Sequence, residues 1–156
     1  MGNKIQKIFP EDLYLSVLPD FVPDEAARWQ GRIDPRRPGR YATGFEAMDA
    51  LVDALHSRGY QTSEQCGAQM GVEGCYLNGF IRIVSGLSFA EWRDRYLLLM
   101  ACELLDKTKT DVQDIARRVG FASSTAFSRW FQKQTGRQPV EWRNGFRTGA
   151  RHRRVR

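Results

Sequence analysis

The sequence contains no apolar run long enough to cross a membrane. The longest nearly apolar run, Tyr96 to Cys102, is far shorter than the ~20 residues that a transmembrane helix needs. Residues 1–10 also lack the apolar core of a signal peptide. These absences predict a protein that stays in the cytoplasm and has no membrane partner.

Residues that hold metals or carry out catalysis are also scarce. There are 3 cysteines and 2 histidines, no C-x-x-C pair occurs, and the histidines lie far from the cysteines along the chain. This pattern argues against a zinc site and against a disulfide framework. The sequence has neither a glycine-rich phosphate loop nor a G-x-S-x-G motif, and no acidic cluster suits a two-metal nuclease. We therefore expect no metal, no cofactor and no enzymatic activity.

Basic residues are in excess, and their distribution is uneven. The 156 residues include 24 Lys+Arg and 18 Asp+Glu, for a net charge of +6 and a pI near 9.5. Residues 1–43 carry 7 basic and 6 acidic side chains (+1), residues 44–107 carry 5 and 9 (−4), and residues 108–156 carry 12 and 3 (+9). A charge concentrated in one part of a chain indicates that this part binds a polyanion, most often nucleic acid.

Apolar residues recur at three- and four-residue spacing from Gly44 onward, which predicts an all-α fold. Sequences with the form of a capping box begin at Thr62 and at Thr110, and Ser88 is a further expected cap. With these starts and with glycines as stops, the expected helices are about 44–58, Ser63–Met70, Glu73–Ser85, Phe89–Asp106, Val112–Val119, Ser123–Thr135 and Pro139–Arg147.

Two parts of this helical region repeat each other. The pattern G-x-x-x-x-E-W-R begins at Gly86 and again, fifty residues later, at Gly136. The simplest arrangement is two homeodomain-like helix–turn–helix subdomains in tandem, joined by a long linker helix. The expected parts are a proline-rich N-terminal extension or arm (1–43), the first subdomain (44–87), the linker helix (88–107), the second subdomain (108–147) and a basic tail (148–156).

A helix–turn–helix binds DNA because its second helix fits the major groove. In the second copy this helix is Ser123–Thr135, and the periodicity places four polar residues on its outer face. Short hydroxyls and an arginine there are suited to base edges. The expected base-reading residues are Ser124, Thr125, Ser128 and Arg129. Basic residues around this helix are expected to contact phosphates, namely Arg117, Arg118, Lys133, Arg137, Arg151, Arg153 and Arg154.

The stretch from Ile115 to Phe121, the stretch from Phe127 to Lys133, and Gly136, Pro139 and Arg143 resemble the signature of AraC/XylS-type transcription regulators. This resemblance covers about residues 44–147 and involves many positions. It implies two helix–turn–helix subdomains on a rigid linker helix, which read successive major-groove segments of double-stranded DNA. It also implies base-facing positions in the first subdomain, at Cys75, Asn78, Gly79 and Arg82.

The first subdomain departs from the family's pattern. Gly79 stands where a long polar or basic side chain is usual, and Cys66-Gly67 replaces a large aliphatic residue followed by alanine. With Glu73 nearby and a charge of −4 over residues 44–107, this unit has little to attract phosphate. One interpretation is that it makes weak contacts to DNA while the second unit sets specificity. The alternative is that the chain is an adaptor that docks on RNA polymerase or another regulator through this unit.

The resemblance also sets expectations for the whole protein. We expect a bacterial transcription activator, located in the nucleoid, that binds DNA as a monomer and contacts RNA polymerase. Most relatives carry a separate sensory domain, and 43 residues are too few for one. We therefore expect the stand-alone type, without a domain for a small-molecule effector.

Several conspicuous residues have structural explanations. The aromatic stripe at helical spacing is expected to fill the core, and Cys66 and Cys102 are expected to face the interior. His56 lies near the end of the first expected helix, where a solvated cap is usual. The basic run that includes Arg36, Arg37 and Arg40 is either a solvated linker or an arm for the minor groove.

Overall fold

The computed structural model describes residues 7–14 and 46–147, and all of the regular structure within these ranges is helical. The predicted all-α fold is therefore confirmed. The helices are α1 (Pro10–Leu13), α3 (Glu46–Arg58), α4 (Ser63–Met70), α5 (Gly74–Ser85), α6 (Phe89–Lys107), α7 (Val112–Val119), α8 (Ser124–Thr135) and α9 (Pro139–Arg147). No helix in these ranges is both long and apolar enough to cross a membrane.

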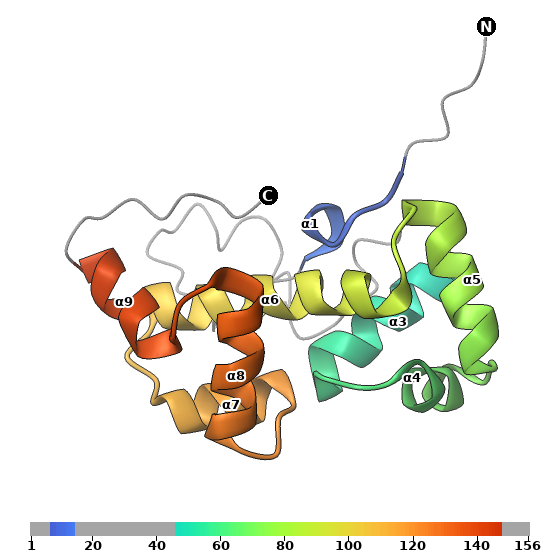
Figure 1. Ribbon diagram of the computed structural model, residues 1–156. Helices are drawn as coiled ribbons and strands as arrows, with labels where there is room; N and C mark the ends of the chain where they lie inside the picture. Colours follow the sequence, from blue (N-terminus) through green and yellow to red (C-terminus); the bar gives the residue numbers. More distant parts are fainter. Residues whose placement is uncertain (1–6, 15–45, 148–156) are drawn as a thin grey trace, which may run out of the picture.

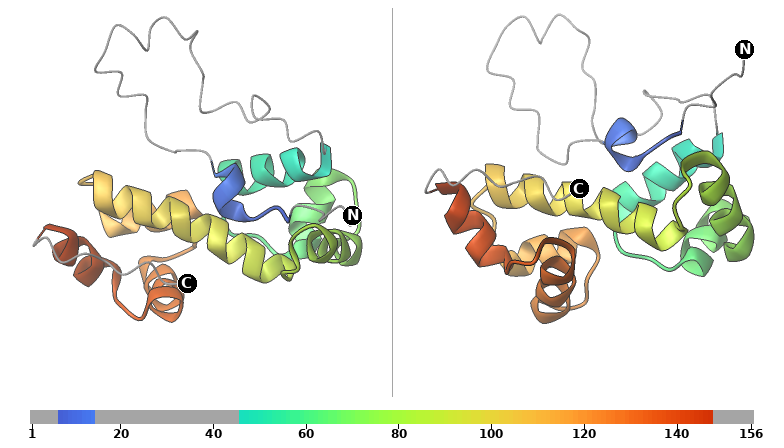
Figure 2. Two further views of the ribbon diagram at one scale, coloured as in Figure 1. Left: turned by 90° about the horizontal axis from the view of Figure 1, so that it is seen from above. Right: turned by 45° about the horizontal axis from the view of Figure 1, so that its top comes forward.

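The helices form two units at the two ends of the long helix α6 (Figure 1). Helices α3 to α5 pack together beside the N-terminal part of α6, and α7 to α9 pack beside its C-terminal part. In each unit a short helix and a second helix meet at a tight turn: α4 with α5, and α7 with α8. The structure is thus a tandem helix–turn–helix, and α5 and α8 run in roughly the same direction (Figures 1 and 2).

Large side chains on α6 contribute to the cores of both units. Trp92 and Tyr96 are fully buried in its N-terminal half, and Leu105 is buried near its C-terminal end. Phe127 and Phe131 of α8 are also fully buried, with ring centroids 5.8 Å apart. The aromatic stripe therefore fills the core, as predicted.

The two interior cysteines differ in exposure. Cys66 is fully buried, whereas Cys102 is half-buried. Burial raises the pKa of the Cys66 thiol to about 11 and that of Cys102 to about 12, with Asp106 adding to the second shift. Both thiols stay protonated near neutral pH, so they act as small apolar groups.

Two of the three expected helix caps form as predicted. The Thr62 hydroxyl accepts from the Gln65 N–H at 3.2 Å, and Ser88 accepts from the Glu91 N–H at 3.2 Å. The third prediction is wrong by one residue, because Asp111 rather than Thr110 is the N-cap of α7. The Thr110 hydroxyl accepts from Thr108 in the preceding turn, while the Asp111 carboxylate accepts from the Val112 N–H at 3.1 Å. A carboxylate at the N-cap also interacts favourably with the positive end of the helix dipole.

Part of the expected N-terminal extension belongs to the first unit. The Ile8 N–H donates to the carbonyl of Val84 at the end of α5 (2.9 Å), and the Ile8 carbonyl accepts from the Trp92 indole (3.2 Å). The Tyr14 hydroxyl donates to the Glu103 carboxylate. Burial raises the pKa of the Tyr14 phenol, and the nearby carboxylate of Glu103 raises it further. Residues 7–14 thus connect α5 to α6. The segment is too short to show a hydrophobic period, so the sequence predicts it only as part of the N-terminal extension.

Other expectations concern residues outside the described ranges. They are the basic run around Arg36, Arg37 and Arg40, expected as a solvated linker or a minor-groove arm, and the tail residues Arg151, Arg153 and Arg154.

Candidate nucleic-acid interface

Helix α8 is held by one apolar face, and this determines which side chains it presents to solvent. Ser123 caps its start by accepting from the Ala126 N–H at 3.2 Å. Phe127, Trp130 and Phe131 are buried against α6, α7 and α9. Successive residues are about 100° apart around a helix, so a residue two positions before or after a buried one points to roughly the opposite side. The face of α8 opposite the buried aromatic residues is therefore its outer face.

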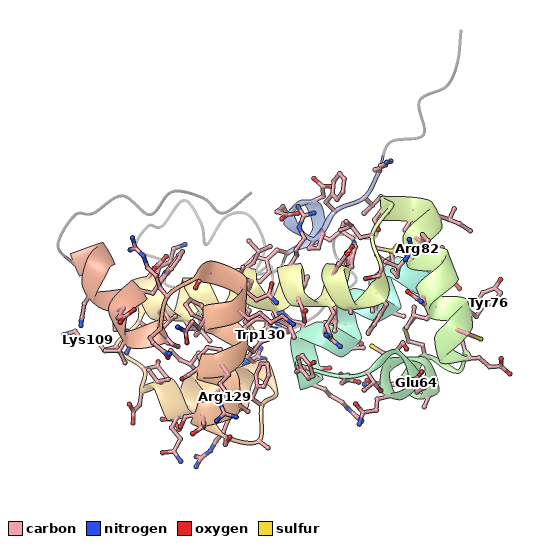
Figure 3. All side chains as sticks on the ribbon, viewed as in Figure 1. Glu64, Tyr76, Arg82, Lys109, Arg129 and Trp130 are labelled. Atoms are coloured by element: carbon pink, nitrogen blue, oxygen red, sulfur yellow. The ribbon has the colours of Figure 1, made fainter. Side chains whose placement is uncertain are left out.

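The predicted base-reading residues of the second unit lie on that outer face. Thr125 and Arg129 are exposed, and Ser124 and Ser128 are half-exposed. Arg129 points away from α6 (Figure 3). The structure therefore brings these four side chains together on one surface of α8, as the sequence analysis expected, and their contact with bases stays a prediction.

The turn before α8 depends on Gly120, which caps α7 in the left-handed conformation (φ 95°). The Phe121 N–H then donates to the Ala116 carbonyl at 2.9 Å. Ala116 is fully buried, and its small side chain lets α7 and α8 approach closely. This packing makes α8 project from the unit, as a recognition helix must.

The predicted phosphate-binding residues are not all equally available. Lys133 and Arg137 are exposed near the C-terminal end of α8, and Arg117 is exposed beside Asp114, with an N–O distance of 3.5 Å. An exposed ion pair of this kind contributes little, so Arg117 can exchange its partner for a phosphate. Arg118 is different: it is half-buried, and its Nη1 donates to the backbone carbonyl of His56 at 2.8 Å. This placement gives Arg118 a structural partner in the first unit instead of a free position on the surface.

His56 is buried, so the expectation of a solvated cap is wrong. Only 6% of the residue is exposed, and Nδ1 has no hydrogen-bond partner among the described residues. Burial lowers the pKa of His56, and the nearby charge of Arg118 lowers it further, while Asp53 and Glu103 act in the opposite direction. Arg118 of the second unit and Glu103 of α6 both lie near this imidazole, and the position of His56 within its own helix does not reveal these distant neighbours.

Acidification is expected to destabilise the protein through His56. The folded state keeps the imidazole neutral, whereas the unfolded chain protonates it near its ordinary pKa of 6.5. Because the unfolded state then binds more protons, the free energy of unfolding falls as the pH drops below about 6.5. Urea unfolding at several pH values measures this slope. The His56→Gln variant should show a shallower slope over the same range, and equal slopes would contradict the assignment.

The first unit places its predicted residues less favourably for reading bases. Cys75 and Arg82 are exposed on α5, but the Asn78 Oδ1 accepts from the Phe89 N–H at 3.0 Å. Asn78 thus satisfies a free backbone donor at the start of α6, and this cap is a role that sequence analysis missed. The Cys75 Sγ lies 3.6 Å from the Glu73 carboxylate, so the surroundings of this helix start are acidic.

The outer surface of α5 is also more apolar than that of α8. Tyr76 on α5 is 73% exposed (Figure 3), and Ile83 on the same helix is 81% exposed. Gly79 lies three residues after Tyr76 and four before Ile83, so the three positions share one face of the helix. At the repeat offset of fifty residues, the matching positions in α8 are Ala126 and Lys133. The outer surface of α5 therefore carries large apolar side chains at positions where α8 carries a small side chain and a lysine.

Comparison with known proteins agrees with this geometry. A family described as "Helix-turn-helix domain" matches residues 67–145. The regulatory protein SoxS of Escherichia coli K12 is 36% identical over 75 residues, which cover 47% of this chain and 69% of that protein. The arabinose operon regulatory protein of Salmonella typhimurium is 36% identical over 69 residues, 44% of this chain and 25% of that protein. The chain thus spans about a quarter of the length of the arabinose regulator that it matches.

Solved structures show the same fold. The C-terminal domain of AraT, a response regulator from Geobacillus stearothermophilus, superposes with a TM-score of 0.56 at 28% identity and covers 63% of this chain and 83% of that one. The DNA-binding domain of AdpA, solved in complex with a target DNA, superposes with a TM-score of 0.58 at 24% identity, covering 66% and 94% of the two chains.

Proposed function

Because this chain belongs to the AraC/XylS-type helix–turn–helix DNA-binding transcription regulators, we propose that it recognises a specific double-stranded DNA sequence mainly through α8. The observation that carries the proposal is the contrast between the two recognition helices. Arg129 stands exposed on α8 beside short hydroxyls, whereas the corresponding position of α5 is Gly79. An arginine can bind guanine O6 and N7 in a bidentate manner, and glycine has no side chain to do so.

The arrangement of the two units supports binding along one face of the duplex. The 19 residues of α6 give it a length of about 28 Å at 1.5 Å per residue. This is close to the ~34 Å that separates major-groove segments one helical turn apart. The related AdpA domain was solved with its target DNA, which supports the same mode of use here. One chain carries both recognition helices, so binding as a monomer suffices in this proposal.

The proposal extends to transcription activation. A relative from Enterobacter sp. strain 638, 28% identical over 106 residues, is named transcriptional activator RhaR, and these residues cover 66% of this chain and 37% of that one. The acidic first unit, with exposed Tyr76 and Ile83, offers RNA polymerase a surface unlike the basic second unit. In this proposal α8 selects the site and the first unit contributes weak DNA contacts and the contact with polymerase.

Selection of binding sites from random DNA with the purified full chain tests the proposal. We expect enrichment of a defined sequence, with the strongest base preferences in the segment that α8 occupies. An adaptor that depends on another regulator should enrich no sequence when it is alone. That result would reject the proposed DNA recognition in favour of the adaptor.

The salt dependence of DNA binding is expected to show whether Lys133 and Arg137 contact phosphates. Each exposed cation that neutralises one phosphate releases condensed counterions, which contributes about 0.9 to the slope of log K against log salt concentration. The double variant Lys133→Ala/Arg137→Ala should therefore lower the magnitude of this slope by about 2 and weaken binding to specific and random DNA alike. Fluorescence anisotropy titrations between low and moderate salt measure the slope. An unchanged slope would exclude both residues from phosphate contact.

A further inference from the structure

The two units touch each other directly, in addition to being joined through α6. The turn after α3 (59–61) meets the turn after α7 (119–121). The Tyr60 N–H donates to the Val119 carbonyl at 2.7 Å, and the rings of Tyr60 and Phe121 lie 4.7 Å apart. This backbone hydrogen bond connects residues that are far apart in sequence and belong to different helix–turn–helix units.

Glycines at this junction permit the close approach. A Cβ on Gly120 would lie 2.3 Å from the Tyr60 nitrogen, and a Cβ on Gly59 would lie 2.1 Å from the Val119 carbonyl oxygen. The corresponding turn glycine of the first unit is Gly71, and a Cβ there would meet nothing within 4 Å. The turn at Gly120, between α7 and α8, is therefore packed against the first unit, whereas the matching turn at Gly71, between α4 and α5, is not packed against anything at this position.

A polar connection runs beside this junction. The Asp94 carboxylate of α6 accepts from the Trp130 indole at 3.2 Å and from the Gln134 amide at 3.4 Å, so it holds α8. The same carboxylate pairs with Arg93 at 2.9 Å, and Arg93 donates to the Gln61 carbonyl at 3.0 Å. The Arg93 guanidinium also lies over the Tyr60 ring, 4.1 Å from its centroid. Trp130 lies where α8 faces the first unit (Figure 3).

We propose that these contacts form an inter-unit clamp that holds α5 and α8 at one fixed separation and angle, with Asp94 as its positioning residue. The inter-unit clamp comprises the two turns 59–61 and 119–121, together with Arg93, Asp94, Trp130 and Gln134. It makes the protein accept the two parts of its DNA site at a single spacing. The spacing part rests on the proposed function, because it requires that both units engage one duplex.

Helix α6 alone does not determine the angle between the units. Each unit is joined to α6 by a short turn, and long helices are rarely straight. The inter-unit clamp adds direct contacts between the two units. If one unit rotated against the other, the hydrogen bond between Tyr60 and Val119 would break and Trp130 would move away from Asp94. Buried and partly buried polar bonds of this kind favour one arrangement over its alternatives, since each broken bond leaves an unpaired group.

Hydrogen exchange of the Tyr60 amide tests the clamp without DNA. If the units are held together, this amide opens only with the global unfolding of the protein and exchanges as slowly as core amides. Exchange as fast as that of an exposed loop amide in the unmodified chain would overturn the clamp. This measurement needs no variant, so it does not depend on the folding of one.

A matched pair of variants locates the effect at Asp94. The double variant Trp130→Phe/Gln134→Ala removes both donors from α8 but keeps the ion pair between Arg93 and Asp94. The control Trp142→Phe removes a similar indole bond, from Trp142 to Asp106 at 2.9 Å, which connects α9 to α6 within the second unit. We expect exchange at Tyr60 to rise about tenfold or more in the double variant relative to the control. An equal rise in both would reject Asp94 as the positioning residue.

The spacing of the selected DNA site supplies the second test. One inserted base pair moves the second half by about 3.4 Å and turns it by about 35°. We expect this insertion to cost the unmodified chain about tenfold or more in affinity, and the Trp130→Phe/Gln134→Ala variant clearly less. Equal losses for both would reject the role in spacing. Failure to select any sequence would reject the proposed function, while slow Tyr60 exchange would still support the contact between the units.

Discussion

Replacing Gly59 by alanine is expected to lower the free energy of unfolding by about 2–5 kcal/mol, a large part of the stability of a domain of this size. Two effects add. The residue has φ 74°, a conformation that strains any side chain, and its Cβ would lie 2.1 Å from the Val119 carbonyl oxygen. Because the atom in the way is backbone, the two units must separate to make room. Chemical denaturation monitored by circular dichroism measures the loss.

Two other glycines separate these effects. Gly71 has φ 76°, but a Cβ there meets nothing within 4 Å, so Gly71→Ala should cost only the conformational strain, about 1–2 kcal/mol. Gly79 lies inside α5 with open space around it, and Gly79→Ala should stabilise the protein by up to about 1 kcal/mol. If Gly59→Ala cost no more than Gly71→Ala, the tight contact between the two units would be refuted.

The second large effect is expected on DNA recognition. Arg129→Ala should weaken binding to the selected site by about 1–3 kcal/mol, roughly 5- to 150-fold, and relax the preference at one base pair. The arginine is exposed on the outer face of α8, where a bidentate contact to guanine is the strongest base-specific interaction that the surface offers. Competition assays with sites altered at single positions measure both the affinity and the relaxed preference.

Arg129→Lys distinguishes base reading from phosphate binding. Lysine keeps the charge but loses the planar fork of donors, so it should keep binding to random DNA while losing affinity for the selected site. Arg82→Ala, on the less basic recognition helix of the first unit, should have a smaller effect on base preference. Equal losses on selected and random DNA for Arg129→Ala would refute its assignment to a base edge.

Most of the helices were predictable because their signals are local. The capping box at Thr62 and the apolar spacing of Phe127 and Phe131 are properties of short stretches, and the structure confirms them. The repeat at Gly86 and Gly136 also predicted the tandem architecture. The docking of residues 7–14 was not predictable, because its backbone bond to Val84 and its contact with Trp92 leave no periodic pattern in so short a segment.

The sequence by itself determined the approximate positions of the helices from α3 to α9, the outer face of α8 and the concentration of positive charge in the last third. These are properties of spacing and composition, which need no knowledge of distant contacts. Only the tertiary structure decided which polar side chains are free to meet DNA. Arg118 donates to a carbonyl 62 residues away, and Asn78 and Asp94 serve other helices. Buried backbone and side-chain groups need hydrogen-bond partners. A polar side chain that the sequence makes available for DNA can therefore already be hydrogen-bonded to a distant part of the chain.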